Sequence, residues 1–269
     1  MPRPEDARVR AARRLTKPAP RARQRLFLAE GPQAVREALA SAGTVTEVFA
    51  TSDFDRRDRG LVQSAGQAQI PWHRASLQAL ASLTQTVTPQ GVVAVCRFLD
   101  RPLDDVFPVV GSQPSLVVLC ANVRDPGNAG TVIRCADAAG ADAVVLSGSS
   151  VDPYNGKCVR ATAGSLFHLP LSAGAPVADA VATLRGAGLR VIAADGAGQH
   201  DLFEAETAGL LSTPTAWLFG NEAWGLPPEL TALADLVVRV PIFGRAESLN
   251  LATAAAVCLY ASARARRGA

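Results

Sequence analysis

The stretch that decides the fold runs from Ser115 to Arg134 and reads SLVVLCANVRDPGNAGTVIR. Residues 115–121 are a nearly continuous apolar run, which is typical of a strand that is covered on both faces of a parallel sheet. Asn, Asp, Pro and Gly follow at once, and a helical pattern then continues to Ala139. A buried strand, a polar turn and a helix in this order predict an α/β unit with a mostly parallel sheet.

The same alternation continues to the end of the chain. Further elements are expected as strand 143–146, helix 177–186, strand 189–194, strand 215–219, strand 236–240 and helix 248–266. A smaller alternation precedes it, with strands expected near 27–31, 45–50, 69–72 and 91–98 and helices over 32–42, 60–67 and 76–83. The Pro- and Gly-rich stretch 101–114 is the predicted linker between a domain over 24–100 and a second over 115–269.

The amino terminus is strongly basic. Residues 1–25 carry nine basic and two acidic side chains, a net charge of +7 in a chain of net charge +3. Residues 1–23 contain four prolines and show no core-facing periodicity, so we expect a flexible arm there. Such an arm, which includes Arg13 and Arg14, either contacts RNA phosphates or is a solvated tail.

Cysteine and histidine usage argues against a metal site. The five cysteines are an odd number without Cys-x-x-Cys spacing, and the three histidines form no zinc-ligand cluster with them. We expect free buried thiols and no metal. No apolar run reaches the roughly 18 to 20 residues of a membrane helix, and the first 25 residues do not resemble a secretory signal. The default expectation is a soluble cytoplasmic protein.

Three polar segments each follow a predicted strand. They are 122–130 (NVRDPGNAG, continuing to Arg134), 218–226 (LFGNEAWGL) and 240–250 (VPIFGRAESLN). Because ligands bind at the carboxyl ends of strands in an open α/β sheet, we expect these loops to converge on one crevice. Glycines there allow close approach of the backbone to a ligand, and Asn and Ser supply neutral hydrogen bonds.

Several reaction classes find no support in these loops. The sequence has no Ser-His-Asp arrangement, no Cys-His pair and no Walker-type phosphate loop. A nicotinamide site is disfavoured because residues 122–130 lack the G-x-G-x-x-G spacing, and the lone G-x-G at 196–198 is a weak signal.

Taken together, the three segments resemble the SpoU (TrmH-like) family of RNA ribose methyltransferases. The first family motif is matched by Asn128, Gly130 and Arg134, the second by FGNEAWG over 219–225, and the third by VPI over 240–242 with SLN over 248–250. The segment DPYNGK over 152–157 with Arg160 also looks like the family. The front domain resembles, more loosely, a ribosomal-protein-like substrate domain, through FLAEG at 27–31 and TPQG at 88–91.

The resemblance implies a C-terminal domain folded as a deep trefoil knot, a rare exception to unknotted topology. It implies that the knot loops bind S-adenosylmethionine, with Gly220, Val240, Ile242 and Leu249 lining the pocket, and that the protein is a homodimer. Ile242 stands where the family usually has methionine. The alternative for Val240, Ile242 and Leu249 is an ordinary place in the core.

The resemblance also implies the catalytic residues. Arg134 would act on the ribose 2′-hydroxyl. Because arginine stays protonated, we favour a role on the adjacent phosphate or on the developing alkoxide over a role as base. Asn128 and Asn250 would place the ribose or the loops, and their alternative role is turn hydrogen bonding. Glu222 would hold Arg134 or a loop amide. Ser248 would cap the last helix or contact substrate.

Three other side chains have two readings each. Lys157 and Arg160 would touch RNA phosphates or lie on a solvated face. Trp224 could stack on a base, and packing in the core is the favoured reading.

The function expected from the resemblance is methyl transfer from S-adenosylmethionine to a ribose 2′-hydroxyl. RNA is implied because DNA lacks that hydroxyl, and 23S ribosomal RNA is favoured. The alternatives are a tRNA 2′-O-methyltransferase and a non-catalytic RNA-binding or assembly factor with the same fold.

Overall fold

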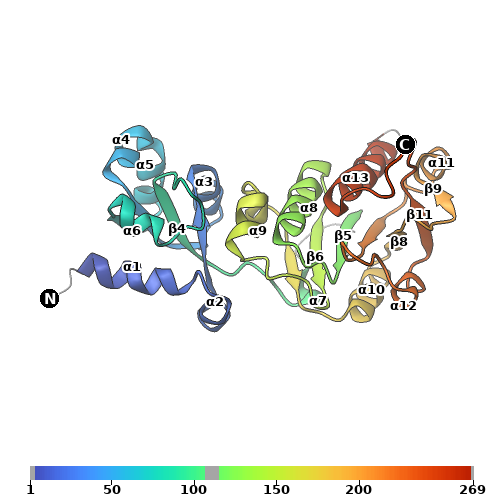
Figure 1. Cartoon of the computed structure of the whole chain (residues 1–269), viewed down its shortest axis with the longest axis horizontal. Coiled ribbons are helices and arrows are strands. Elements are labelled where there is room, and N and C mark those ends of the chain that lie inside the picture. The colour runs from blue at the N-terminus through green and yellow to red at the C-terminus, as the bar shows by residue number, and fades with distance from the viewer. Residues whose placement is uncertain (1–3, 107–114, 268–269) are drawn as a thin grey trace. The chain divides into compact units, whose positions relative to one another are not determined.

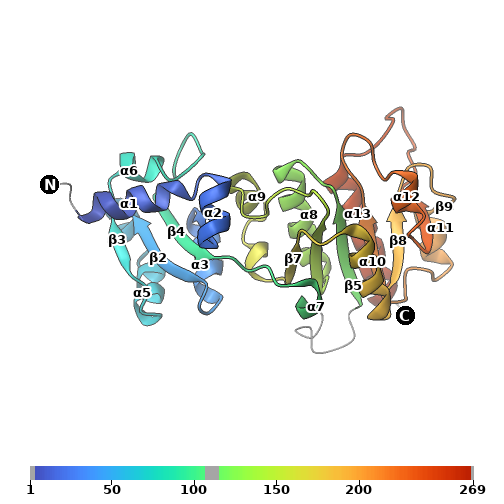
Figure 2. The same ribbon diagram turned by 90° about the horizontal axis from the view of Figure 1, so that it is seen from below.

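The computed structural model describes residues 4–106 and 115–267, with side chains from residue 7 onward. The chain divides into two compact units. The first comprises residues up to Leu99 together with Tyr154–His168, and the second comprises Asp100–Pro153 together with the residues from Leu169 onward. Each unit is a β-sheet with helices packed on it, as two views at right angles show (Figures 1 and 2).

The second unit is built on a seven-stranded sheet. Its strands are β5 (Leu116–Ala121), β6 (Ala143–Ser147), β7 (Leu171–Ala173), β8 (Arg190–Ala194), β9 (His200–Asp201), β10 (Thr215–Phe219) and β11 (Leu236–Arg239). They lie in the order β7-β6-β5-β10-β8-β11-β9, and every pair of neighbours is parallel. This confirms the mostly parallel α/β fold expected from the sequence.

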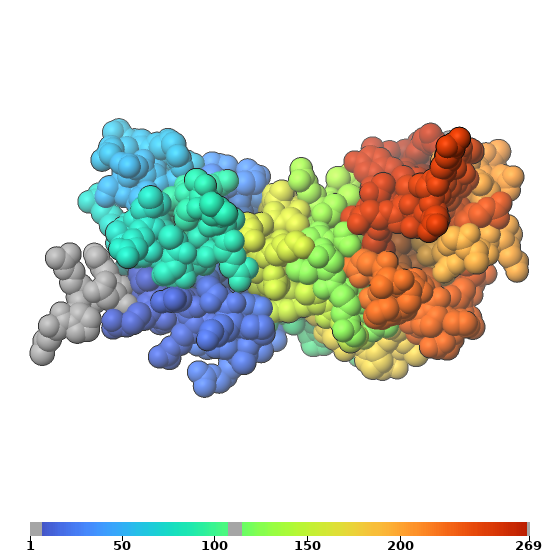
Figure 3. All heavy atoms as spheres, viewed as in Figure 1, coloured from blue at the N-terminus to red at the C-terminus, as the bar shows by residue number. Residues whose placement is uncertain are grey.

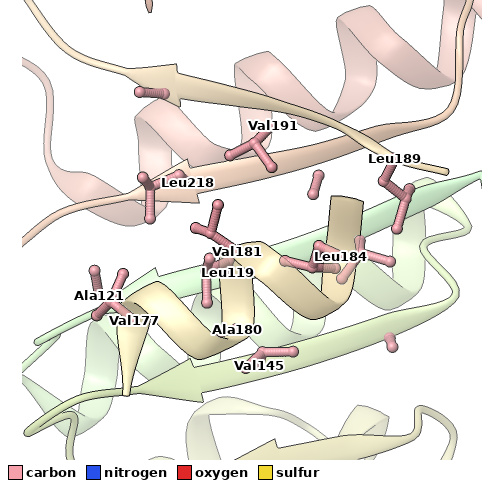
Figure 4. Packing of buried hydrophobic residues seen from close by; sticks show 14 of the residues in the cluster. Leu119, Ala121, Val145, Val177, Ala180, Val181, Leu184, Leu189, Val191 and Leu218 are labelled. Carbon is pink, nitrogen blue, oxygen red and sulfur yellow. The ribbon is translucent and has the colours of Figure 1, made fainter. Parts of the chain in front are cut away.

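Helices cover both faces of this sheet. They are α7 (Leu103–Val106), α8 (Pro126–Ala139), α10 (Val177–Gly186), α11 (Leu202–Thr207), α12 (Pro228–Thr231) and α13 (Leu251–Arg267). Helix α10 packs on one face, where Val181 and Leu184 meet Leu119, Val191 and Leu218 of the central strands (Figure 4). Helices α8 and α13 pack together on the other face, where the indole N–H of Trp217 donates to Ser262 of α13 (2.9 Å). Covering on both faces explains why β5, β6 and β10 are buried along their whole length.

The first unit has a four-stranded mixed sheet. Its strands are β1 (Leu26–Glu30), β2 (Val45–Ala50), β3 (Trp72–Arg74) and β4 (Val92–Arg97). The order is β1-β4-β2-β3, antiparallel except for the β2–β3 pair. Its helices are α1 (Pro4–Arg14), α2 (Pro18–Gln24), α3 (Pro32–Ala40), α4 (Ser52–Arg57), α5 (Arg59–Gln67), α6 (Leu77–Ala81) and α9 (Gly156–Ala161), with a short 3-10 helix, η2, over Ser165–Phe167. Strand β3 begins at Trp72, where the sequence prediction had its strand end.

The basic amino-terminal segment is helical, so the prediction of an arm without regular structure is wrong for the residues from 4 onward. Leu15, just after α1, and Ala12 within it are buried in a core cluster with Phe49, Leu80 and Val95. The guanidinium of Arg21 is buried too, and it donates to the carbonyl of Leu15 (3.0 Å). Arg13 and Arg14 remain exposed on α1.

Part of the predicted linker, residues 101–114, belongs to the second unit. Residues 103–106 form helix α7, and Val106 is fully buried in the core of the second unit. The rest of that linker, 107–114, lies outside the described residues. The segment 154–168 packs in the first unit, where the ring of Tyr154 stacks on Phe98 with centroids 3.8 Å apart.

Leu15→Ala tests the docking of the amino-terminal helices. Removing its buried side chain should destabilise the first unit by about 2–5 kcal/mol, because a cavity is left in the cluster. Hydrogen exchange of the full chain, followed by mass spectrometry, should show faster exchange over residues 4–24 than in wild type. The exposed Lys17→Ala is the matched control. If residues 4–24 of the wild type exchange as fast as an unstructured peptide, the docking is refuted.

Candidate functional site

Four neighbouring strands bring the polar loops together. In the sheet, β5, β10, β8 and β11 are adjacent and parallel, so their carboxyl ends lie along one edge. The three predicted loops follow β5, β10 and β11, and a fourth loop, Asp195–Gln199, follows β8 between two of them. The expectation that polar loops converge at this edge is confirmed for the backbone.

The carboxylate of Glu222 joins the loop after β10 to the loop after β5. It accepts hydrogen bonds from the backbone N–H of Arg124 (3.1 Å), from the backbone N–H of Asp125 (3.0 Å) and from the side-chain amide of Asn128 (3.3 Å). Of the two roles considered for Glu222, the structure has the one in which it holds loop amides. A negative charge here also lies near the amino end of α8, where the helix dipole favours it.

Asn128 connects this pair of loops to the third. Its side-chain oxygen accepts a hydrogen bond from the side-chain amide of Asn250 (3.0 Å). Asn250 is the cap of α13, because its side-chain oxygen accepts the backbone N–H of Ala252 (2.9 Å). The helix therefore begins three residues later than the sequence suggested, and the idea that Ser248 caps it is wrong. Ser248 is exposed.

Two asparagines that the sequence analysis did not select support the same loops. Asn122 has a positive φ of 58°, and its side-chain oxygen accepts the backbone N–H of Ser149 (2.9 Å). The side-chain amide of Asn221 donates to the carbonyl of Asn122 (2.7 Å). Asparagine tolerates left-handed backbone and bonds locally, which was the only available signal for these positions.

Two glycines lie against neighbouring backbone. A Cβ on Gly220 would fall 2.7 Å from the nitrogen of Leu226 and closer still to the carbonyl of Gly225. A Cβ on Gly198 would fall 2.7 Å from the backbone nitrogen of Arg239. No larger residue fits at either position, so two of the four loops are held close to adjoining backbone. Such glycine-lined loops at strand ends suit a ligand that is bound largely through backbone groups.

The third predicted loop is largely at the surface. Ile242 is 38% exposed, and Val240 and Leu249 are half-buried, so none of these three side chains has an ordinary place in the core. The ring of Phe243 stacks on Phe203 of α11 with centroids 6.4 Å apart. The orange-red atoms of this part of the chain project from the surface of the second unit (Figure 3).

Two arginines, Arg124 and Arg134, are exposed on the loop and helix that carry Asn128. Arg134 is exposed on α8, and within the described part of the chain its guanidinium makes no hydrogen bond or ion pair. It does not bind Glu222, which was the other role considered for that carboxylate. Arg124 is also exposed, and its guanidinium donates to Ser149 (3.0 Å). The sequence analysis did not single out Arg124.

Trp224 is not a core residue. From the sequence, we expected Trp224 to pack in the core. Its side chain is instead 58% exposed, whereas Trp217 in β10 is fully buried. The residue lies in a turn that closes between Asn221 and Gly225, where two backbone hydrogen bonds of 3.0 and 2.9 Å connect these residues.

The remaining predicted RNA-binding residues lie in the first unit. Arg160 is half-buried and pairs with Glu30 (3.2 Å), so it is not on a freely solvated face. Lys157 is exposed in the first turn of α9. Neither residue is among those that meet at the strand ends of the second unit.

The cysteines do not supply a nucleophile. All five are free, and burial raises the pKa of the Cys96 and Cys258 thiols far above their ordinary value. Burial also raises the pKa of Cys135, which the charge of neighbouring Arg134 opposes. These thiols stay protonated and unreactive near neutral pH.

Neither a metal centre nor a membrane-spanning helix is found among the described residues. Among them, no group of three or more His, Cys, Asp or Glu side chains is arranged to hold a metal ion. None of the helices in the described ranges is long and apolar enough to cross a membrane.

Comparison with known proteins identifies the two parts of the chain. The model of the SpoU rRNA Methylase family matches residues 115–260, and the model of the MRM3-like substrate binding domain matches residues 6–94. The 23S rRNA (guanosine(2553)-2'-O)-methyltransferase of Bacillus subtilis is 35% identical over 243 residues, which cover 89% of this chain and 89% of that protein.

Solved structures agree over nearly the whole chain. The AdoMet-bound rRNA methyltransferase from Sinorhizobium meliloti superposes with a TM-score of 0.83 at 33% identity, covering 98% of this chain and 97% of that one. The SpoU methyltransferase AviRb from Streptomyces viridochromogenes, in complex with AdoMet, gives 0.81 at 31% identity, covering 98% and 100%. With the family model matching more than half of its residues, the chain belongs to the SpoU rRNA methylase family.

Proposed function

We propose that the protein transfers a methyl group from S-adenosylmethionine to a ribose 2′-hydroxyl of 23S ribosomal RNA. The observation that carries the proposal is the hydrogen-bonded chain Glu222–Asn128–Asn250, which links three loops at the strand ends. Relatives named as 23S rRNA 2'-O-methyltransferases and neighbours solved with AdoMet support the same substrate and donor.

The loops fit a donor bound mainly through backbone. We propose that Gly220, Val240, Ile242 and Leu249 line its pocket; the close backbone approach at Gly220 and the half-exposed positions of the other three support this. S-adenosylmethionine, when bound, supplies a methyl group on a positively charged sulfonium, which is already activated for transfer. The protein's own task is then to position the acceptor ribose.

Each polar residue has a separate part in that task. Arg134, exposed and without a partner in the described chain, stabilises the developing 2′-alkoxide or binds the adjacent phosphate. Glu222 acts through Asn128, because it fixes the loop from which that amide projects. Asn128 and Asn250 hold each other and orient the ribose. Ser248, exposed beside Asn250, contacts the substrate.

Three further proposals come with the family. We propose that the loops after β10 and β11 form a trefoil knot, that the active protein is a homodimer, and that it works in the cytoplasm.

The first unit, matched by a substrate-binding family model, holds the RNA with help from Arg13, Arg14, Lys157 and Arg160. We further propose a substrate-binding domain that begins with the amino-terminal helices, runs to Leu99 and includes residues 154–168, with the catalytic domain formed by the rest of the chain from Asp100 onward.

A methylation assay on unmodified RNA tests the function. Purified protein and labelled S-adenosylmethionine should methylate a 23S rRNA transcript but not a mixture of tRNA transcripts. The methylated linkage should resist alkaline cleavage, since a 2′-O-methyl group removes the attacking hydroxyl. Label that enters only tRNA would contradict the proposed substrate, and alkali-labile label would point to a base. No label in either RNA would leave a non-catalytic RNA-binding protein.

Arg134→Ala tests the proposed catalytic residue. Turnover should fall about 100- to 1000-fold, the usual effect of removing one donor at a developing oxyanion. The Kd for S-adenosylmethionine, measured by calorimetry, should stay within a few-fold. Arg134→Lys should recover part of the rate if positive charge is what matters. Arg185→Ala, on α10, is the control, and near wild-type turnover by Arg134→Ala would remove Arg134 from the mechanism.

Gly220→Ala tests the donor pocket. The added methyl overlaps the backbone of Gly225 and Leu226, so the loop must shift, and the affinity for S-adenosylmethionine should fall about tenfold or more. Gly186→Ala is the matched control, because a Cβ there meets nothing within 4 Å. Equal donor affinity in the two variants would place the pocket elsewhere.

A double substitution tests RNA binding by the amino-terminal helix. Replacing both Arg13 and Arg14 by Gln removes two exposed charges without touching the buried Leu15. If both contact phosphates, the slope of log K against log salt should become shallower by about 1.4 to 1.8. Arg56→Gln, an exposed change on α4, should leave the slope unaltered. An unaltered slope in the double variant would exclude these two contacts.

A further inference from the structure

Trp224 exposes its indole in the loop after β10, close in sequence to Glu222. A large apolar side chain that is 58% exposed gains little from the fold, and single exposed apolar residues are by themselves unremarkable. Its position is more informative than its exposure. It lies two residues after Glu222, whose carboxylate holds the loop that presents Asn128.

The turn that carries Trp224 is fixed on both sides. Asn221 and Gly225 exchange two backbone hydrogen bonds, and the side-chain oxygen of Asn221 accepts the backbone N–H of Ala223 (2.8 Å). Gly225 takes a positive φ of 66°, and Gly220 packs on its backbone without space for a Cβ. The indole is thus presented from a rigid base, which lowers the entropy lost when it binds a partner.

The surroundings favour a nucleic-acid partner. Arg124 and Arg134 are both exposed on the loop and helix that follow β5, and Glu222, two residues before Trp224, is bonded to that loop, so the same group of loops carries positive charge and the aromatic ring. Unpaired RNA bases stack on aromatic side chains while nearby cations neutralise phosphates. In unpaired RNA loops, the ribose 2′-hydroxyls lie next to bases whose faces are free to stack.

We propose that Trp224 stacks on an unpaired base next to the ribose that receives the methyl group. This inference rests on the proposed function, since it assigns the RNA contact of the same site. Stacking would fix the position of the flanking nucleotide and, through the backbone, of the target ribose. Trp224 is therefore a positioning residue for the acceptor.

The test compares Trp224→Ala with Trp224→Phe in the full chain, with a 23S rRNA transcript as acceptor. The alanine variant should lose roughly 10- to 100-fold in kcat/KM for RNA, mainly through KM, because stacking on one base is lost. The phenylalanine variant keeps a stacking face and should stay within a few-fold of wild type. Donor affinity and the sedimentation coefficient should be unchanged in both.

Tryptophan fluorescence gives a readout that a merely structural role would not move. Among the three tryptophans, Trp217 is fully buried and Trp72 lies in the first unit, bonded to Asp55. Adding a short unstructured RNA oligonucleotide should quench the emission of wild type and of Trp72→Phe. The quenching should be much smaller in Trp224→Phe.

Three results would overturn the stacking proposal: equal kcat/KM in the alanine variant and wild type, donor affinity that falls in parallel with activity, or dissociation of a wild-type dimer in the alanine variant. The last would mean that a second copy of the chain covers the indole. If wild type does not methylate the transcript, the proposed function fails, and the quenching experiment alone decides whether Trp224 stacks on RNA.

Discussion

The arrangement of the site depends on the hydrogen bonds that the carboxylate of Glu222 accepts. Two of its three donors are backbone N–H groups at the start of α8, and a helix start leaves such groups without intrahelical partners. Its third donor, Asn128, binds Asn250, which in turn caps α13. One charge therefore satisfies a helix terminus and, through two amides, ties three loops that are far apart in the sequence. An apolar residue at position 222 would leave these donors without an acceptor.

The sheet of the second unit could be predicted from sequence because burial on both faces demands unbroken apolar runs such as 116–121 and 215–219. The polar loops could be predicted as well, since they follow those runs. The pairing among their side chains could not. Asn122 and Asn221 carry no signal beyond residue type, and the hydrogen bond between them joins positions 99 residues apart. Strands as short as β7 and β9 have too few residues to show a period.

The amino-terminal segment shows why its composition led to the wrong prediction of a flexible arm. Nine of its first 25 residues are basic, a density that is typical of disorder, but ordering needs only a few well-placed apolar contacts. Ala12 and Leu15 are three apart and bury one side of α1, while the Arg13 and Arg14 between them stay in water. The buried guanidinium of Arg21 is tolerated because the carbonyl of Leu15 accepts from it. A charge count treats this arginine like the others.

The hydrogen-bond partners of the site residues separate side chains that hold the loops from a side chain that is free to meet the substrate. Glu222, Asn128 and Asn250 form their hydrogen bonds with one another and with the backbone, so they fix the positions of the loops. Burial raises the pKa of the Cys96 and Cys258 thiols, so these two contribute no nucleophile. Within the residues that the structure describes, the exposed guanidinium of Arg134, on the same helix as Asn128, has no bonded partner. A site in which these polar side chains hold one another, while an arginine keeps its guanidinium unbonded, is suited to placing an acceptor and stabilising negative charge. For methyl transfer from an activated donor, the further requirement is that the acceptor hydroxyl loses its proton to water.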